Sequence, residues 1–570
     1  MSQAKQQVQW ILREAPDGWE RLLPTGMPPI LGRLLAQRGI GKDGVDGFLR
    51  PRLAQLSDPF EIPEVDLAVK RIFQAIDQKE KVCIFGDYDV DGVSSITILQ
   101  GVLEAFGLQP FSFIPRRSSE GYGLSDAGLS RCLGQCGRPD LLISVDCGTV
   151  SNEAIASLKR SGVDTVVVDH HEIGPDGRPD CVALVNPKAS GDPRQYLCAA
   201  GVVFKLAHAL LKRRPVEGFD LKSALDLVAV ATVSDIVPLV EENRLLVRHG
   251  LRILEKSNRP GLKALLKLTG TEGRISSSDI GFRIGPRLNA AGRMDQPERA
   301  LAALMTECDK EASDLADELE HFNRSRQQLE QVIFAEAMAM IEGSLNDPVI
   351  VVGSRSWHAG IVGIVASRLM RMYHKPVFVI SIDGDGVGKG SGRSIAGVSL
   401  VDAIRACRDH LISGGGHHMA AGLSIREEDI AGFRQDFIRF VREHCDSDEL
   451  APKVHVDAEV KLADICLEFL SSYELLQPFG SANPQPTFMA RNVWLADSPK
   501  SLKNNHLRLI LRQDYNQRTA IFFGGGAYDL PDPPWDIAFT VDRNFFRGRT
   551  SIQISIQNVR SAERHDDETC

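Results

Sequence analysis

Short apolar runs alternate with amphipathic stretches between residues 66 and 270. The runs KVCIFGD (81–87), LLISVDCG (141–148) and DTVVVDHH (164–171) lack the polar alternation of a half-exposed strand. Runs of this kind predict strands that are buried on both faces, as in a parallel sheet covered by helices. Helical patterns lie between them, for example at 94–107. This part of the chain is therefore predicted to be α/β.

The pattern changes twice further along the chain. Residues 306–342 repeat apolar side chains at three- and four-residue steps, which predicts one helix of about 55 Å. A second α/β segment is expected from 348 to 440. From 452 to 560 the pattern alternates strictly, as in HLRLILRQ (506–513), which is typical of antiparallel strands with one exposed face.

A chain of 570 residues is too long for one hydrophobic core, so we expect several domains. The predicted fold class is α/β, with an all-β domain at the end. The expected parts are an N-terminal helical lead-in at 1–65, a parallel-sheet domain at 66–300, a connecting long helix at 301–345, a smaller α/β domain at 346–445 and the all-β domain at 452–562.

Composition places the chain among ordinary globular proteins, with 43% hydrophobic and 25% charged residues. No apolar run approaches the roughly 18 residues of a membrane helix, and the N-terminus lacks the apolar core of a signal peptide. Eleven scattered cysteines favour reduced thiols and a cytoplasmic location. Cys132 and Cys136 could face one another on a helix, but no second pair with zinc spacing follows. The net charge of −9 argues mildly against a nucleic-acid binder, although a local basic groove is compatible with it.

Acidic and imidazole side chains follow the predicted strands at their carboxyl ends. In a parallel α/β sheet these ends share one edge, where ligands bind. Unpaired carboxylates so close together would raise one another's pKa, and divalent cations are the simplest remedy. Carboxylate and imidazole ligands suit Mn²⁺ or Mg²⁺, and two such ions about 4 Å apart can activate a water molecule. The residues concerned are Asp87, Asp89, Asp91, Asp146, Asp169, His170, His171 and, after an apolar helical run, Asp235.

Two simpler interpretations compete with a metal site. The segment GDYDVDG (86–92) partly matches a calcium EF-hand loop, but Ile98 occupies the twelfth position, where such a loop needs glutamate. Each aspartate could instead cap a following helix. Capping explains any single aspartate, but it explains the whole set poorly. Asp169 could also act by orienting a histidine ligand.

The motifs GDYDVDG, SVDCG, VDHHE and ATVSDIVPL resemble, in order and spacing, the four signature motifs of the DHH phosphoesterase superfamily. The resemblance implies a site for two divalent ions, Mn²⁺ or Mg²⁺. It also implies that Asp87 and His171 take part in catalysis beside the ligands. The implied ligands are Asp89, Asp91, Asp146, His170 and Asp235.

The segment SGGGHHMAAG (413–422) resembles the companion DHHA1 domain. Glycines let a backbone approach a phosphate closely, so Gly415 and Gly416 are expected to contact substrate. His417 is expected to donate to a phosphate oxygen. Arg287 or His417 is expected to stabilise charge that develops during the reaction.

Further motifs resemble the single-strand-specific exonucleases of this superfamily. They are FIPRRSSEGYGLS (113–125), FRIGPRLNAAGRM (282–294) and KGSGRS (389–394). The resemblance implies a pocket for a 5′ phosphate that contains Arg117, Ser391 and Arg393. Surface ion pairs are the alternative role for the two arginines. PFGSANPQP (478–486) departs from the pattern, with Ala482 in place of an expected glycine.

The resemblance also implies that the last domain is an OB-fold that binds single strands. Its segment RNFFRGR (543–549) interleaves aromatic and basic residues. Phe545 could stack on bases while Arg547 contacts phosphates. Alternatively, the two phenylalanines belong to the core of a hairpin.

The expected function is 5′→3′ degradation of single-stranded DNA in DNA repair and recombination. We expect a monomer that works beside a single-strand-binding protein and a helicase, with no membrane partner. One alternative is a phosphodiesterase for short oligonucleotides or cyclic dinucleotides, which the long chain and the OB-like end disfavour. The other is a non-catalytic replication scaffold, which would not need the complete aspartate set.

Overall fold

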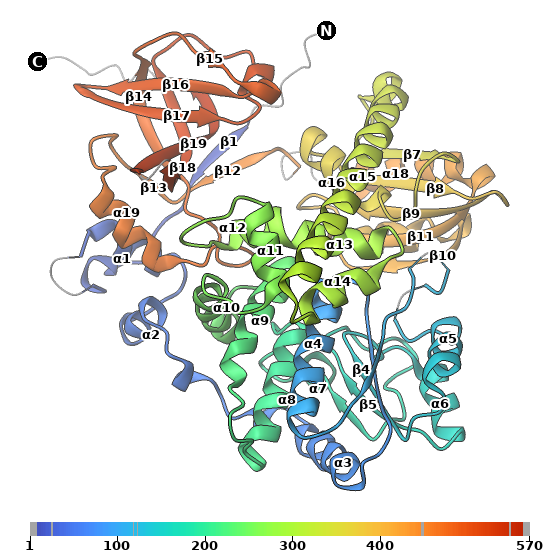
Figure 1. Ribbon diagram of the computed structural model, residues 1–570. Helices are drawn as coiled ribbons and strands as arrows, with labels where there is room; N and C mark the ends of the chain where they lie inside the picture. Colours follow the sequence, from blue (N-terminus) through green and yellow to red (C-terminus); the bar gives the residue numbers. More distant parts are fainter. Residues whose placement is uncertain are drawn as a thin grey trace, which may run out of the picture. The chain divides into compact units, whose positions relative to one another are not determined.

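The computed structural model (Figure 1) describes residues 8–23, 27–117, 119–121, 123–445, 450–546 and 549–562. The chain forms two compact units. The larger comprises residues 56–450 and 480–482, and the smaller comprises residues 1–55, 451–479 and 483–570. Within the described ranges, no helix combines the length and the apolarity that crossing a bilayer requires.

A parallel five-stranded sheet forms the centre of the larger unit, in the order β3-β2-β4-β5-β6. Helices cover both of its faces (Figure 1), so the central strands are buried along their length. This explains why their sequences are apolar throughout, and the predicted parallel sheet is confirmed. The strands are β2 (Val82–Gly86), β3 (Phe111–Phe113), β4 (Leu141–Val145), β5 (Asp164–Val168) and β6 (Ala183–Val185).

The helices around this sheet fall into two groups. α5 (Asp126–Cys136) and α6 (Asn152–Arg160) pack on one face, over Phe85 and Leu142. α4 (Val90–Ala105) and α8 (Ala199–Arg213) pack together on the other face. The remaining helices of this part are α3 (Val65–Gln78), α7 (Pro187–Ser190), α9 (Leu225–Ser234), α10 (Glu241–Leu254), α11 (Pro260–Leu268), α12 (Ser277–Asp279), α13 (Gly285–Arg293) and α14 (Pro297–Met305).

The predicted long helix is α15 (Asp309–Ile341), which has 33 residues. Its first half packs against α11, α13 and α14. Its second half shares a core with α16 (Val362–Tyr373), in which Ile333 and Ala337 are buried. The helix therefore joins the parallel-sheet domain to the next domain along the chain.

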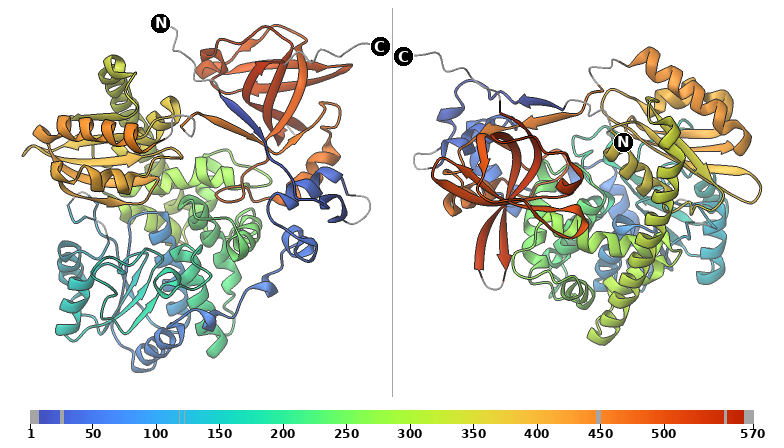
Figure 2. Two further views of the ribbon diagram at one scale, coloured as in Figure 1. Left: turned by 180° about the vertical axis from the view of Figure 1, so that it is seen from behind. Right: turned by 90° about the horizontal axis from the view of Figure 1, so that it is seen from above.

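A second five-stranded sheet follows, in the order β10-β11-β9-β8-β7. Only its β7–β8 pair is parallel. α16 and α15 cover one face, while α17 (Leu400–Ala406) and α18 (Ile430–His444) cover the other (Figure 2). The strands are β7 (Ile350–Ser354), β8 (Val377–Ile382), β9 (Val387–Arg393), β10 (Leu411–Gly416) and β11 (Ala420–Arg426).

The smaller unit contains the predicted all-β domain. β14 pairs with both β18 and β16, which closes β14, β18, β19, β17 and β16 into a barrel. The β17–β19 pair is parallel, whereas the sequence pattern predicted antiparallel strands. This small closed barrel has OB-fold architecture, as expected. Its strands are β14 (Phe488–Leu495), β16 (Leu507–Gln513), β17 (Asn516–Phe522), β18 (Trp535–Phe546) and β19 (Arg549–Ser561), with short β13 (Ala458–Glu459) and β15 (Lys500–Ser501) beside them.

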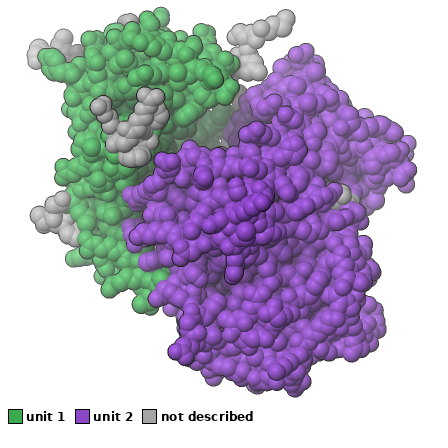
Figure 3. Space-filling view, in the orientation of Figure 1, with its two compact units in different colours: residues 1–55, 451–479, 483–570 green, residues 56–450, 480–482 purple. Residues whose placement is uncertain are grey.

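The N-terminal residues belong to the same unit as this barrel (green in Figure 3). β1 (Gln9–Leu12) pairs in parallel with β12 (Lys453–Val456). α1 (Pro29–Ala36) and α2 (Val45–Leu49) contribute apolar side chains to the barrel's core. The predicted helical lead-in thus also contains a strand. Its pairing partner lies more than 400 positions away, so no local pattern indicates it.

Gly261 tests the close packing of α11 on α14. A Cβ atom at this position would lie 1.7 Å from the carbonyl oxygen of Ala303. Because backbone must move to make room, Gly261→Ala should lower the free energy of unfolding by about 1–3 kcal/mol or more. A lower urea midpoint of the full chain would report this loss.

Gly101→Ala in α4 is the matched control, since a Cβ there meets nothing within 4 Å. It should raise stability by about 0.5–1 kcal/mol, because alanine loses less backbone entropy in a helix than glycine. Equal urea midpoints for the two variants would contradict the packing described here.

Candidate functional site

The carboxyl end of β5 delivers an imidazole to the centre of three carboxylates. Nε2 of His170 lies 3.4 Å from Oδ1 of Asp146, 3.6 Å from Oδ2 of Asp235 and 3.7 Å from Oδ2 of Asp91. The fold thus brings together residues that are up to 144 positions apart in the sequence: Asp146 and His170 follow β4 and β5, Asp91 lies in the first turn of α4, and Asp235 is the C-cap of α9. This is the edge at which such sheets bind ligands.

Every residue that the sequence nominated as a ligand, together with Asp87 and His171, lies in overlapping groups at this edge. In each group one ligand atom per residue lies within 4.8 Å of the others. We call this set the carboxylate cluster. Its groups are Asp87, Asp89 and Asp146; Asp91, His170 and Asp235; and Asp146, His170 and His171.

Hydrogen bonds from backbone amides hold the carboxylates of Asp91 and Asp89 in place. The carboxylate of Asp91 accepts hydrogen bonds from the amides of Ala199 (2.7 Å) and Ala200 (2.8 Å), at the N-terminus of α8. Oδ1 of Asp89 accepts from the amides of Asp91 (2.9 Å) and Gly92 (3.2 Å) and so caps α4. The capping alternative is therefore correct for one oxygen of Asp89, while the same carboxylate also belongs to the cluster.

Asp169 orients the neighbouring histidine. Its Oδ1 lies 2.7 Å from Nδ1 of His171 and accepts from the amide of His170 at 2.7 Å, and its Oδ2 accepts from the amide of Thr149 at 3.0 Å. These contacts fix the position of the His171 ring through its Nδ1. The sequence suggested that Asp169 orients a histidine ligand; the ring that it contacts is that of His171, and its contact with the predicted ligand His170 is to the backbone amide.

Burial, and then electrostatic crowding, raise the pKa values of the clustered carboxyl groups. Burial, followed by the charge of nearby aspartates, raises the pKa of Asp91 to about 7 and that of Asp235 to about 8. The same two causes raise the pKa values of Asp87 and Asp146 well above the usual range. Negative charge is therefore costly here unless a cation offsets it.

The two histidines differ in charge. Burial, and then the neighbouring His171, lower the pKa of His170 to about 3, so its imidazole is neutral. Burial would also lower the pKa of His171. The hydrogen bond with Asp169 and the nearby carboxylates outweigh burial and raise this pKa to about 9. The cluster therefore offers one neutral imidazole that can ligate and one protonated imidazole that can donate.

The donor set fits divalent cations. Oδ1 of Asp87 and Oδ1 of Asp146 are buried and have no hydrogen-bond partner among the described residues. Buried polar atoms without a partner destabilise a fold, and a cation would satisfy both. Carboxylate and imidazole donors without a thiolate suit Mn²⁺ or Mg²⁺.

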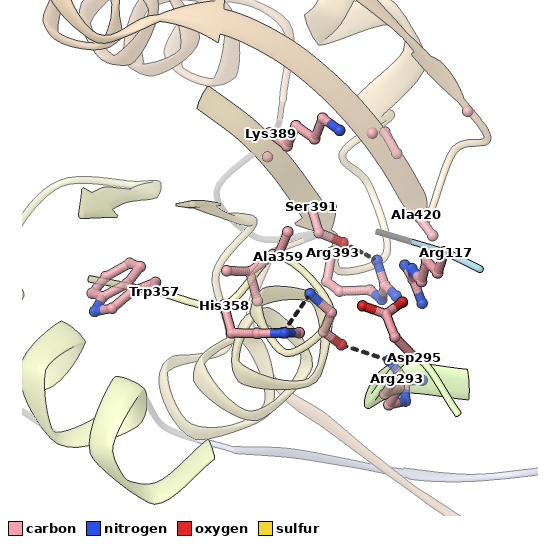
Figure 4. A pocket seen from close by; sticks show the side chains of 16 residues that line it. Arg117, Arg293, Asp295, Trp357, His358, Ala359, Lys389, Ser391, Arg393 and Ala420 are labelled. Carbon is pink, nitrogen blue, oxygen red and sulfur yellow. Dashed lines mark hydrogen bonds between the residues drawn. The ribbon is translucent and has the colours of Figure 1, made fainter. Parts of the chain in front are cut away.

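A cavity of 640 Å³ lies between the parallel-sheet domain and the second sheet, within the larger unit (Figure 4). We call it the arginine pocket, because Arg117, Arg293 and Arg393 line it. Arg393 donates to Oγ of Ser391 (3.1 Å), and Arg293 donates to the carbonyl of Gly360 (2.9 Å). Its other lining residues include Asp295, Trp357, His358, Lys389 and Gly416.

The arginine pocket adjoins the carboxylate cluster. The guanidinium of Arg117 lies over the ring of Tyr88, 5.4 Å from its centroid, and Tyr88 stands between Asp87 and Asp89 in the sequence. Burial, and then the charge of Arg117, lower the pKa of Arg293 to about 10 and also lower that of Arg393. A bound anion would relieve this repulsion, and the planar guanidinium suits a terminal phosphate.

Three residues predicted to act on substrate occupy other surroundings. Arg287 forms an ion pair with Glu320 (2.8 Å) and donates to the carbonyl of Arg283 (2.6 Å). Gly415 is exposed in β10, and His417 follows that strand, with its amide donating to Ala420 (2.8 Å). The catalytic role of Arg287, the substrate-binding role of Gly415 and both roles of His417 stay predictions.

Two further predictions fall outside what the structure describes. Arg547 lies outside the described residues, and the side chain of Phe545 does too. Conversely, the sequence did not nominate Arg293, Asp295 or His358 for the pocket. Arg293 is the last arginine of the motif FRIGPRLNAAGRM, so this motif could have indicated its place in the pocket.

Three family models match the chain. The DHH family N-terminal domain matches residues 81–232, the DHHA1 domain matches residues 346–443 and the RecJ OB domain matches residues 456–558.

Proteins named single-stranded-DNA-specific exonuclease RecJ are similar over nearly the whole chain. The protein from Bacillus subtilis is 36% identical, covering 94% of this chain and 68% of its own length. The protein from Salmonella typhimurium is 34% identical, covering 97% of this chain and 99% of its own length. The crystal structure of RecJ from Thermus thermophilus in complex with Mn²⁺ matches with a TM-score of 0.83 and 28% identity, over 98% of this chain and 80% of that one. A Mg²⁺ complex of that protein also matches, with a TM-score of 0.78.

The raised pKa values predict how the stability of the metal-free protein depends on pH. Folding raises the pKa values of Asp91, Asp235 and His171 to about 7, 8 and 9. The folded state then binds more protons than the unfolded state, so this stabilisation is lost as pH rises through these values. The lowered pKa of His170 opposes the trend only below its ordinary value of 6.5. The Tm in a chelator should therefore fall between pH 6.5 and 9.

Asp235→Asn provides the control for this pH dependence. The amide cannot titrate, so the Tm of this variant should fall less steeply over the same interval. Saturating Mn²⁺ should also flatten the wild-type profile, because bound cations keep the carboxylates ionised. Identical slopes for the wild type and the variant in chelator would contradict the electrostatic description of the cluster.

Proposed function

This chain belongs to the RecJ family of single-stranded-DNA-specific exonucleases, and we propose that it hydrolyses single-stranded DNA from the 5′ end. The chemistry takes place at the carboxylate cluster. The observation that carries this proposal is the contact of Arg117 with Tyr88. This contact sets a cationic pocket for a terminal phosphate directly beside the hydrolytic groups.

Two divalent ions, Mn²⁺ or Mg²⁺, are the cofactors of the reaction. When bound, they would activate the attacking water and offset charge on the phosphate oxygens. The residues that would hold them are Asp89, Asp91, Asp146, His170 and Asp235, with Asp87 beside them.

His171 acts on the substrate as a proton donor in this proposal. Its Nδ1 is held by Asp169 at 2.7 Å, so Nε2 is the nitrogen that can face a phosphate oxygen. In the protein without bound cations, a pKa of about 9 keeps the ring protonated at neutral pH. It can therefore hydrogen-bond a non-bridging oxygen or supply a proton to the departing 3′ oxygen.

The arginine pocket sets the direction of degradation. Arg117 and Arg393 hold the 5′-terminal phosphate, and Ser391 hydrogen-bonds it while fixing the Arg393 guanidinium at 3.1 Å. The first phosphodiester bond of the strand then lies over the carboxylate cluster. A strand without a free 5′ end cannot place a phosphate in this pocket.

The edge of the second sheet continues this binding surface. Gly416 lines the arginine pocket, and Gly415 and His417 lie beside it in the chain. We assign their backbone and imidazole donors to the phosphates that follow the first bond. Arg287 acts less directly, because its ion pair with Glu320 ties α13 to α15. We assign it the positioning of Asn289, which accepts a hydrogen bond from the amide of Val90 (3.2 Å) beside Asp89.

The substrate is single-stranded DNA, and the biological setting is DNA repair and recombination. In this proposal the OB-fold at 452–562 also binds the single strand. A monomer that works in the cytoplasm beside a single-strand-binding protein and a helicase completes the proposal, since strand separation by a helicase supplies this substrate.

Asp146→Asn tests the hydrolytic role of the cluster. Asp146 has φ of 60°, a conformation that asparagine tolerates, so the variant keeps the backbone while losing the charge. Cleavage should fall by about 100-fold or more, since even residues behind a metal ligand cost 10–100-fold. Binding of a 5′-phosphorylated oligonucleotide, measured by fluorescence anisotropy, should be retained.

Oligonucleotides labelled at either end complete this test. The wild type with Mn²⁺ should release a 5′ label first, whereas a 3′ label should persist until late. Asp176→Asn, on an exposed loop, should cut like the wild type. Wild-type rates for Asp146→Asn would refute the cluster's role, and early release of the 3′ label would refute the polarity alone.

Arg393→Ala tests the phosphate pocket. The wild type should prefer a 5′-phosphorylated strand to a 5′-hydroxyl strand. Loss of one charged hydrogen-bonding group is worth about 1.5–3 kcal/mol, so the variant should lose this preference by about 10-fold or more. The effect should appear in KM for the phosphorylated strand, with kcat on the hydroxyl strand unchanged.

Arg355→Ala is the matched control for charge. Arg355 belongs to the same domain but is exposed and paired with Glu427, so its loss should leave the preference intact. Equal discrimination by Arg393→Ala and the wild type would show that the pocket does not bind the 5′ phosphate.

A further inference from the structure

Three cysteine thiols meet on the face of the parallel sheet that α5 covers. Cys83 lies on β2, and Cys132 and Cys136 lie one helical turn apart on α5. The three Sγ atoms lie within 4.8 Å of one another, and those of Cys83 and Cys132 are 3.5 Å apart. We call this set the thiol cluster. It is separate from the carboxylate cluster and has no part in the proposed hydrolysis.

The spacing of the sulfurs fits a metal centre. Thiolate–metal bonds of about 2.3 Å place three sulfurs about 4 Å apart when they surround one ion in a plane. The observed thiols already lie in that range, and two rigid elements hold them there. α5 packs directly on β2, where Phe85 and Leu129 belong to the same buried core. Little rearrangement is therefore needed to bring the three sulfurs onto one ion.

The burial of the cluster provides both a dry site and an entry path. The side chains of Cys83 and Cys132 are fully buried, whereas Cys136, at the end of α5, is partly exposed. Cys136 donates to the carbonyl of Gly137 (3.0 Å). The hydrogen bond with Cys83 is the largest influence on the pKa of Cys136 and lowers it. Burial opposes this effect, but Cys132 and Lys81 add to the lowering, and the pKa falls to about 6. An ion can thus first reach a thiol at the surface that loses its proton more readily than an ordinary cysteine.

The number and type of donors select the ion. The group contains three sulfurs and, among the described residues, no fourth histidine, cysteine or carboxylate ligand. Zinc in structural sites takes four ligands. Soft thiolates favour Cu⁺, and a trigonal set of three sulfurs in an apolar interior suits this ion. Lys81 offsets part of the negative charge at the exposed end.

We propose that Cys83, Cys132 and Cys136 form a binding site for one soft, thiophilic ion, with Cu⁺ as the best match. Each sulfur that ligates the ion releases its proton to solvent, and no electron is transferred. The site ties α5 to β2. Since β2 leads into Asp87 and α5 follows the loop of Arg117, an ion here would brace both parts of the nuclease site.

Anaerobic titration of the full chain with Cu⁺ tests this proposal, with Mn²⁺ present and bicinchoninate as the competing chelator. The wild type should retain one equivalent of Cu⁺ against the chelator. Cys136→Ser should weaken this binding by at least 10-fold while the Tm without Cu⁺ stays close to that of the wild type. Cys308→Ser, at an exposed thiol outside the cluster, should bind like the wild type.

X-ray absorption of the Cu⁺-loaded wild type gives a second readout that requires no variant. Three sulfur neighbours at about 2.3 Å are expected. Undiminished Cu⁺ binding by Cys136→Ser, or a spectrum with nitrogen or oxygen neighbours, would overturn the proposal. Retention of Zn²⁺ in preference to Cu⁺ under the same competition would also overturn it.

Discussion

The structure depends on holding several carboxylates together in a buried place. Asp91 and Asp146 are almost fully buried, and each stands within a few ångströms of the same imidazole. Like charges at this separation repel strongly where water is excluded. The fold therefore fixes them with backbone donors, such as the two amides of α8 that hold Asp91. Backbone donors offset only part of this repulsion, and the remaining negative charge attracts divalent cations.

The parallel sheet positions the carboxylate cluster, and the long helix α15 connects it to the domain that completes the arginine pocket. The sheet aligns the carboxyl ends of β2, β4 and β5 and so gathers the acidic groups. α15 joins this domain to the one that carries Ser391 and Arg393. A direct contact holds the two domains together, since Arg293 of the first donates to the carbonyl of Gly360 in the second (2.9 Å). The arginine pocket thus depends on packing between domains, whereas the carboxylate cluster depends on one sheet edge.

Sequence patterns were sufficient to predict the features that follow from one rule, namely that the carboxyl ends of parallel strands meet at one edge of the sheet. Buried strands ending in acidic residues predicted both the parallel sheet and the meeting of Asp146 with His170. Features that depend on distant partners were not predictable. The anchoring of Asp91 by α8, the pairing of β1 with β12 and the ion pair between Arg287 and Glu320 join segments that carry no shared pattern.

Net charge was a poor guide to the substrate, and the structure explains why. The chain carries −9 overall, yet three arginines gather in one pocket, which we propose binds a strand's terminal phosphate. Much of the acidic excess at the active site is charge that cations would offset. Fields in a cleft act over roughly a Debye length of about 8–10 Å, so a polyanion responds to the local groups and not to the total. An acidic protein can therefore bind DNA wherever its arginines converge and its carboxylates are covered by metal.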